Sequence, residues 1–342
     1  QLYESQRLQY IEEEKLLHRY KGVRAATKDD HEVQLNVNLG SLEDLEIAIK
    51  IGAEGVGLLR TEFMYLNRKN LPTEDELFLI FKKFLIRMGK YPVILRTLDI
   101  GGDKDLNYVN LPKERNPFLG FRGSRLVRDP EFKNVLITQL RAALRASAHG
   151  NLKIMFPMIT TVDEVNNLLI LMENTKRNLH KEGYKIAETV EVGIMVEVPS
   201  IAICADMVAP VVDFFSIGTN DLTQYTLASD RTNESVAYLY NHYHPSIIRL
   251  IQRVVEGAHN HNKWVGVCGE LASDPLAVPL LIGLGVDELS MQSHSVLRAK
   301  EIITKTTYTE CKDLKNQVLK LGTSKKIRKR LLDFQNRIAR AD

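Results

Sequence analysis

The 342-residue chain has few of the residues that cross-link or anchor a protein, with only three cysteines and one tryptophan. Cys204, Cys268 and Cys311 are odd in number and far apart, which argues against a disulfide framework and for a reducing compartment. No stretch reaches the roughly 20 uninterrupted apolar residues that a membrane helix needs. The N-terminal segment QLYESQRLQYIEEEKLLHRY is too charged for a signal peptide. We therefore expect a cytoplasmic protein without membrane insertion.

An excess of one charge is also missing, because 46 Lys and Arg oppose 43 Asp and Glu. This near balance gives no reason to expect nucleic acid as a partner. The basic run KKIRKR at residues 325–330 is typical of a solvated helix face. The chain does not begin with Met, so we expect it to be part of a longer protein.

Familiar cofactor motifs are absent as well. The sequence contains no P-loop, and GAEGVG at residues 52–57 fits the dinucleotide-binding fingerprint neither in order nor in context. Nucleotide is therefore disfavoured as a substrate. His and Cys residues at zinc-ligand spacing are missing too, which argues against zinc.

What the sequence does contain is a repeated pattern of short, nearly continuous apolar runs followed by helical stretches. Such runs are typical of parallel strands covered on both faces. Two of the helical stretches are 41–53, with Ser41 as its cap, and 161–183, which Gly183 closes. The eight runs lie at residues 33–39, 55–60, 92–98, 153–158, 192–198, 213–218, 264–269 and 287–291.

Eight strands alternating with helices predict an α/β fold, a (β/α)8 TIM-type barrel with long βα insertions. The longest insertion is expected between Leu98 and Lys153. A doubly wound open sheet is the competing architecture, because periodicity does not say whether the sheet closes.

Arginines stand at or near several expected strand ends. Arg60 and Arg96 end adjacent strands, and Arg122, Arg125 and Arg231 lie in loops. A guanidinium beside an apolar strand is costly unless an anion meets it, and its planar fork suits phosphate or carboxylate. Each arginine alone is explained by capping a carbonyl or pairing with an acid. Several arginines on one rim favour an anionic ligand.

Two acidic residues follow consecutive strands. Glu197 ends one run, and Asp221 follows Gly218, Thr219 and Asn220 in VDFFSIGTNDLTQYT. Two carboxylates completed by water and substrate oxygens are a usual way to hold Mg²⁺. The alternative is that both acids only cap loops. With the metal, these residues would form a polar lip for an anionic small molecule.

Cys268 ends another apolar run and precedes Gly269. An isolated free cysteine is commonly a small buried hydrophobic residue. Beside several arginines, however, its thiol is a candidate proton donor or nucleophile, because charges in the site tune its proton affinity.

Taken together, these stretches resemble the phosphoenolpyruvate-binding C-terminal domain of enzyme I of the bacterial sugar phosphotransferase system. The resemblance runs from about residue 22 to 310 and extends to the wider family of pyruvate phosphate dikinase and phosphoenolpyruvate synthase. DLTQYTLASDR and CGELASDP are more similar to enzyme I than to these two relatives. The matching segments are GVGLLRTEFMYLNR, LRTLDIGGDK, NPFLGFRGSR, IMFPMI, GIMVEVPS, DFFSIGTNDLTQYTLASDR and GVCGELASDP.

The resemblance implies a role for each matching residue. Glu197 and Asp221 would hold Mg²⁺, and Cys268 would protonate the enolate as pyruvate forms. Arg60, Arg96 and Arg231 would clamp the phosphate and the carboxylate of phosphoenolpyruvate. The full substrate-binding set is Arg60, Arg96, Lys104, Arg122, Asn220, Asp221 and Arg231, with Lys104 and Arg122 as secondary phosphate contacts.

The resemblance also implies what lies outside this sequence. Enzyme I passes the phosphoryl group to a histidine in a TSH-like motif on a separate N-terminal domain, and none of the nine histidines here has that setting. His242 and His244 are expected to serve structure. The chain is thus expected to bind phosphoenolpyruvate and Mg²⁺, to hand the phosphoryl group to a histidine-bearing domain and to release pyruvate. A phosphocarrier protein and a homodimer are implied partners.

The expected organisation is a linker helix at 1–22, the barrel at 23–315 and a basic helical tail at 316–342. Three other functions stay open: a domain of the pyruvate phosphate dikinase or phosphoenolpyruvate synthase type, a Mg²⁺-dependent pyruvate-enolate lyase, and a non-catalytic phosphoenolpyruvate-sensing dimer module. A carbon–carbon lyase needs no phosphate clamp, so the arginine cluster disfavours it.

Overall fold

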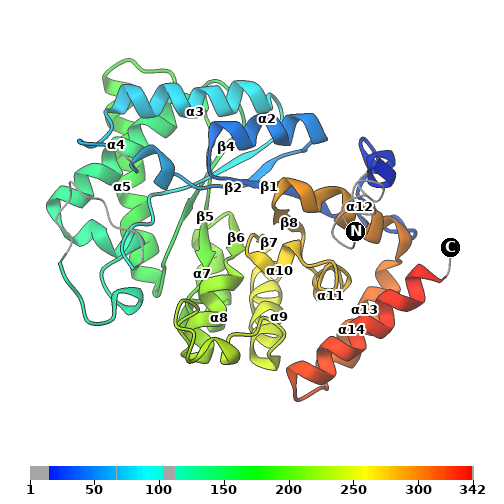
Figure 1. Ribbon diagram of the computed structural model, residues 1–342. Helices are drawn as coiled ribbons and strands as arrows, with labels where there is room; N and C mark the ends of the chain where they lie inside the picture. Colours follow the sequence, from blue (N-terminus) through cyan, green and yellow to red (C-terminus); the bar gives the residue numbers. More distant parts are fainter. Residues whose placement is uncertain (1–14, 67, 103–111, 341–342) are drawn as a thin grey trace, which may run out of the picture.

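The computed structural model describes residues 15–66, 68–102 and 112–340. Eight strands form a closed parallel barrel in the order β1 to β8 (Figure 1). The barrel closes because β1 pairs with β8, with Gln34 beside Glu288 and Val37 beside Met291. The predicted barrel is therefore confirmed, and the open sheet is excluded. The strands are β1 (Gln34–Leu39), β2 (Val56–Leu59), β3 (Val93–Arg96), β4 (Leu152–Phe156), β5 (Glu191–Val196), β6 (Phe214–Ile217), β7 (Trp264–Val267) and β8 (Glu288–Met291).

Helices surround the strands and cover their outer faces (Figure 1). As the sequence predicts, Ser41 caps α2 by accepting a hydrogen bond from the Asp44 amide. Gly52 ends this helix in a left-handed conformation. Gly183 follows α5 with a φ of +82°. The helices around the barrel are α2 (Leu42–Ile51), α3 (Glu74–Met88), α4 (Pro130–Ser147), α5 (Val162–Lys181), α6 (Pro199–Ile203), α7 (Ala205–Val208), α8 (Thr219–Leu227), α9 (Pro245–His259), α10 (Glu270–Ser273), α11 (Val278–Leu284) and α12 (Val296–Lys305).

The longest connection, between β3 and β4, is the predicted insertion. It contains the short 3-10 helices η3 (Pro117–Leu119) and η4 (Gly123–Arg128) before α4 begins. Lys104 belongs to this connection but lies outside the described residues. Because the chain returns to the barrel at η4, Arg122 comes back beside Asp99, which follows β3, at a distance of 3.0 Å between Nη2 and Oδ2.

The C-terminal residues form two helices, α13 (Tyr308–Val318) and α14 (Ser324–Ala339), which lie together at one side of the barrel (Figure 1). The predicted boundary at residue 315 falls inside α13. Ile327, Leu331 and Phe334 of α14 are buried in the main hydrophobic core. Four basic residues of the 325–330 run, Lys325, Lys326, Arg328 and Lys329, are exposed, which confirms the predicted solvated face.

Most of the expected N-terminal linker helix, residues 1–14, lies outside the described residues. The remainder contains η1 (His18–Tyr20), after which Gly22 has a φ of +77°. No helix within the described ranges is long and apolar enough to span a bilayer.

Candidate active site

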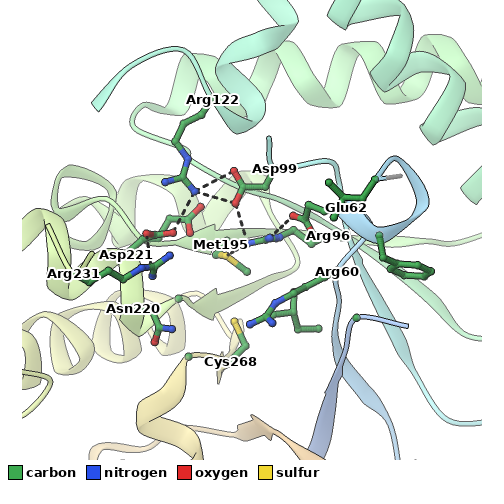
Figure 2. A pocket seen from close by; sticks show the side chains of 17 residues that line it. Arg60, Glu62, Arg96, Asp99, Arg122, Met195, Asn220, Asp221, Arg231 and Cys268 are labelled. Carbon is green, nitrogen blue, oxygen red and sulfur yellow. Dashed lines mark hydrogen bonds and ion pairs between the residues drawn. The ribbon is translucent and has the colours of Figure 1, made fainter. Parts of the chain in front are cut away.

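A cavity of about 430 Å³ opens at the carboxyl ends of the barrel strands (Figure 2). This is the end at which TIM barrels carry their functional groups. Arg125, another candidate from the sequence, does not line this cavity; its Nη1 donates to the Leu119 and Gly120 carbonyls. Eight other sequence-predicted site residues do line it. These residues are Arg60, Arg96, Arg122, Glu197, Asn220, Asp221, Arg231 and Cys268.

Arg96 projects from the end of β3 and is buried between two acids. Its Nη2 lies 2.5 Å from Glu62 Oε1, and its Nη1 lies 3.2 Å from Asp99 Oδ2. Burial alone would lower the pKa of Arg96, but the charges of Glu62 and Asp99 outweigh it and raise this pKa. The guanidinium therefore stays charged and is held rigidly at the bottom of the cavity.

Arg122 is the second buried cation and approaches from the insertion. Its Nη2 contacts Asp99 at 3.0 Å and Asp221 at 3.4 Å (Figure 2). Its Nη1 donates to the Tyr225 hydroxyl at 3.0 Å. Tyr225 in turn donates to the Phe118 carbonyl. Arg122 thus joins α8 to the end of β3 and to η3.

Arg60 and Arg231 are the more accessible cations. Arg231 is partly exposed, with Nη1 3.5 Å from Asp221 Oδ1. Arg60 is exposed, and no described acid forms a salt bridge with it. Its charge is therefore available to an anion in the cavity.

Glu197 and Asp221 line the same cavity, as consecutive strand ends predict, and Asp221 lies beside Arg122 and Arg231. Glu197 is 1% exposed, and its Oε1 accepts a hydrogen bond from the Met158 amide at 2.6 Å. Burial and then the neighbouring charges of Asp221 and Asp99 raise the pKa of Glu197 to about 8. Oδ1 of Asp221 is buried and makes no hydrogen bond with any described residue.

These two acids suit a hard cation. A cation between them would offset their repulsion and approach Asp221 Oδ1, which makes no hydrogen bond with described residues although Arg231 Nη1 lies 3.5 Å away. Oxygen donors are what Mg²⁺ prefers. The described residues contain no group of three or more His, Cys, Asp or Glu arranged for a metal. Further oxygens would therefore have to come from water or substrate.

The residues after β6 were predicted to form a polar lip of the cavity, and Asn220 does so whereas Thr219 does not. Asn220 lines the cavity, and its side chain is locked to Glu270: Nδ2 donates to Glu270 Oε1 at 3.1 Å, while Oδ1 accepts from the Glu270 amide at 2.9 Å. Thr219 is fully buried. A Cβ on Gly269 would stand 2.0 Å from Thr219 Oγ1, so Thr219 fills the space that Gly269 leaves and does not reach the cavity.

Cys268 lies at the floor of the cavity, just after β7. It is 3% exposed, and its Sγ is 3.7 Å from the Ile217 carbonyl oxygen. Burial raises the pKa of Cys268 to about 11. At neutral pH the group is a thiol, which suits a proton donor better than a nucleophile.

Sequence reasoning assigned no role to several residues that shape this site. Glu62 and Asp99 hold Arg96, Tyr225 holds Arg122, and Glu270 holds Asn220. Each of these residues lies directly after a strand or in the first helical turns beyond one. This position is the feature of the sequence that could have identified them. The predicted structural role of His244 is confirmed, because it caps α9 by accepting from the Ser246 amide.

A second cavity of about 550 Å³ adjoins the first. The two cavities share Gly40, Arg60, Asn220, Cys268 and Gly269. Glu270 and His294 border only the second cavity. Arg60 and Cys268 therefore stand between two openings into the same site.

The sequence is similar to those of known proteins. The sequence model of the family described as "PEP-utilising enzyme, PEP-binding domain" matches residues 14–308. The chain is 49% identical over 325 residues to a phosphoenolpyruvate-protein phosphotransferase of Priestia megaterium, covering 95% of this chain and 56% of the relative. It is 51% identical over 301 residues to the protein of that name from Bacillus subtilis, covering 88% and 52%. The chain thus spans about half the length of these relatives.

Among solved structures, a citrate lyase from Burkholderia xenovorans matches with a TM-score of 0.50 and 14% identity, covering 93% of this chain and 96% of that chain. At this identity the likeness shows the fold alone.

Proposed function

Because the chain belongs to the PEP-utilising enzymes and matches their PEP-binding domain, we propose that it is the phosphoenolpyruvate-binding half of a phosphoenolpyruvate-protein phosphotransferase. The observation that carries this proposal is the convergence of four arginines, two acids and Cys268 on one cavity. In this role the domain would bind phosphoenolpyruvate, give its phosphoryl group to a histidine and release pyruvate.

The four arginines fall into two groups with different roles in binding phosphoenolpyruvate, which is a trianion. Arg96 and Arg122 are fixed by buried carboxylates, so they supply preorganised positive charge that costs no reorganisation when the reaction occurs. Arg60 and Arg231 are accessible and provide the contacts that form as substrate enters. Asn220 would add a hydrogen bond, and Lys104 and Arg122 would be secondary phosphate contacts.

Glu197 and Asp221 would hold Mg²⁺. The bound ion would neutralise charge on the transferring phosphoryl group and on the substrate carboxylate, as metal ions do in phosphoryl transfer. Of these two acids, Asp221 is already fixed in place by Arg122 and Arg231.

Cys268 would complete the reaction after phosphoryl transfer. When the bridging P–O bond breaks, the substrate is left as an enolate, and its C3 needs a proton. The Cys268 S–H bond breaks as the new C–H bond forms, which gives pyruvate and a thiolate. Because burial raises the pKa of Cys268 to about 11, the proton is held on sulfur until that moment.

The acceptor is proposed to be a histidine on a separate domain, which receives the group and passes it to a phosphocarrier protein. None of the nine histidines lines the first cavity, and the adjoining cavity gives an incoming side chain room to reach Arg60. We further propose a homodimer and a cytoplasmic location; the three free cysteines support the latter.

The test uses phosphoenolpyruvate labelled on phosphorus, Mg²⁺ and a separately produced histidine-bearing domain. We expect acid-labile phosphate on that domain and one pyruvate per phosphate, with neither product when the domain is omitted. Acid-labile phosphate on this chain alone, for instance at His294, would refute the need for a second domain. Cleavage of 2-oxo acids without phosphate transfer would favour a lyase instead.

A further inference from the structure

The interior of the barrel has one apolar side and one polar side. Leu58, Ile94, Met155, Met195, Phe214 and Cys268 form an apolar cluster inside it. Asn36 and Asn38 of β1, Ser216 of β6, and Glu288 and Ser290 of β8 provide polar groups there. A buried carboxyl beneath an active site is costly and needs a reason.

Glu288 is 2% exposed and points into the barrel. A Cβ on Gly57 would stand 2.0 Å from Glu288 Oε1 and 2.4 Å from Ser290 Oγ, so Gly57 provides the space that Glu288 occupies. Oε1 of Glu288 and both ends of the Asn36 amide make no hydrogen bond with described residues. Buried polar atoms of this kind are commonly satisfied by water.

The other carboxyl oxygen of Glu288 faces β7. Glu288 pairs with Gly266 across β7 and β8, and Gly266 pairs with Ser216 across β6 and β7. A Cβ on Gly266 would be 3.4 Å from Glu288 Oε2. Since Gly266 has no side chain, Glu288 and Ser216 lie on either side of it with no side chain between them.

Ser216 lies between Glu288 in the barrel interior and Cys268 in the active site. Cys268 lies two residues beyond Gly266, on the same face of the chain. Burial raises the pKa of Cys268, and the nearby Ser216 hydroxyl partly opposes that rise. The backbone of Cys268 is also fixed from below, because Asn38 Nδ2 donates to its carbonyl at 2.9 Å and Ser290 Oγ donates to Asn38 Oδ1 at 2.6 Å.

We propose that Glu288 is the buried acid that returns a proton to Cys268 after each turnover, by way of Ser216 and a water molecule held over Gly266. This inference rests on the proposed function. The Cys268 thiolate takes the Ser216 hydroxyl proton, Ser216 takes one from the water, and the water takes the carboxyl proton of Glu288. The net change is one S–H bond formed and one carboxyl O–H bond broken, and solvent later reprotonates Glu288.

The direction of this transfer follows from the burial of both groups. Burial raises the pKa of Glu288 to about 7; Asn36 and Lys153 oppose the rise, and Asp287 adds to it. The pKa of Cys268, which Arg96 lowers and Glu197 and Glu288 raise, is still about 11. A proton therefore passes from Glu288 to the thiolate downhill. The proposed route reaches Cys268 from the barrel interior, whereas both cavities meet it at the carboxyl ends of the strands.

The test separates the first turnover from later ones by rapid quenching of pyruvate formation, with phosphoenolpyruvate, Mg²⁺ and the histidine-bearing domain. In Glu288→Gln, Cys268 still begins as a thiol. We expect one pyruvate per chain at the wild-type rate, followed by steady turnover at least about 10-fold slower. Ser216→Ala should show the same burst. Glu191→Gln removes an acid of β5 that pairs with Lys153, and it should change neither phase.

Wild-type steady turnover in both Glu288→Gln and Ser216→Ala would overturn the proposal, as would loss of the first turnover in variants that still bind phosphoenolpyruvate. If Glu288→Gln does not fold, Ser216→Ala decides alone. In the wild type, steady turnover should fall as pH rises through about 7, the pKa of Glu288, and this fall should vanish in Glu288→Gln. A wild type that binds no phosphoenolpyruvate would instead refute the proposed function, and this inference with it.

Discussion

Replacing Arg60 by Ala tests the anion clamp without disturbing the fold. Arg60 is exposed and lines both cavities, and no described acid forms a salt bridge with it. Its removal leaves no buried carboxylate unpaired, so the free energy of unfolding should change by no more than about 0.5 kcal/mol. A lost hydrogen bond to a charged group is worth about 1.5–3 kcal/mol, which weakens phosphoenolpyruvate binding by a factor of about 10–150.

Arg96→Ala provides the contrast, because it leaves Glu62 and Asp99 buried without their cation. Breaking such a buried pair costs about 3–5 kcal/mol of stability. Calorimetric titration with phosphoenolpyruvate and Mg²⁺, together with urea unfolding, measures both quantities. Arg87→Ala, which breaks an exposed pair with Glu46, is the control. Wild-type affinity in Arg60→Ala would refute the reasoning, and so would a loss of stability equal to that of Arg96→Ala.

Three further outcomes follow from single side chains. Cys268→Ala should bind phosphoenolpyruvate within about 3-fold of wild type but form pyruvate about 100-fold more slowly, measured by a coupled dehydrogenase assay; equal rates would exclude Cys268 as the proton donor. Burial raises the pKa of Glu288 from an ordinary value of 4.5 to about 7, which at about 1.4 kcal/mol per unit corresponds to about 3 to 4 kcal/mol. Below pH 4.5 Glu288 is neutral in both the folded and the unfolded chain, and the fold keeps this stability. As pH rises from 4.5 to about 7, the free energy of unfolding measured in urea should fall by this amount in the wild type. Glu288→Gln should show no such fall. Phe334→Ala in α14 should cost about 3–5 kcal/mol in the same assay, whereas an independent tail would lose nothing.

The sequence predicted the strands well because each buried strand is a short apolar run that ends at polar residues. β6, for example, occupies Phe214–Ile217 inside the predicted run 213–218. Closure of the barrel was not determined by such runs. It depends on the pairing of β1 with β8, and a local hydrophobic pattern is the same in an open sheet and a closed one.

The site was predictable to the extent that strand ends converge. Parallel strands place their carboxyl ends on one rim, so Arg60, Arg96 and Cys268 had to meet once the barrel closed. Which acid neutralises which arginine was not predictable. Arg122 reaches Asp99 only because the insertion folds back over the barrel, and such a return depends on tertiary packing.

The polar side of the barrel interior was not predicted either. Ser216 stands in an otherwise apolar run, whereas Asn36 and Glu288 stand in runs where polar residues alternate with apolar ones. Their orientation depends on side-chain alternation in a barrel whose inner face is not fully apolar. The glycines on the neighbouring strands would have indicated this arrangement. Gly57 and Gly266 have no side chain and so leave space beside Glu288.

The most direct test of the central claim is a crystal structure of the chain grown with phosphoenolpyruvate and Mn²⁺ in place of Mg²⁺, with anomalous diffraction to locate the metal. We expect one anomalous peak at the carboxylates of Glu197 and Asp221, with the phosphate and carboxylate of the substrate against Arg60, Arg96 and Arg231. A substrate bound elsewhere, or a metal away from both carboxylates, would contradict it.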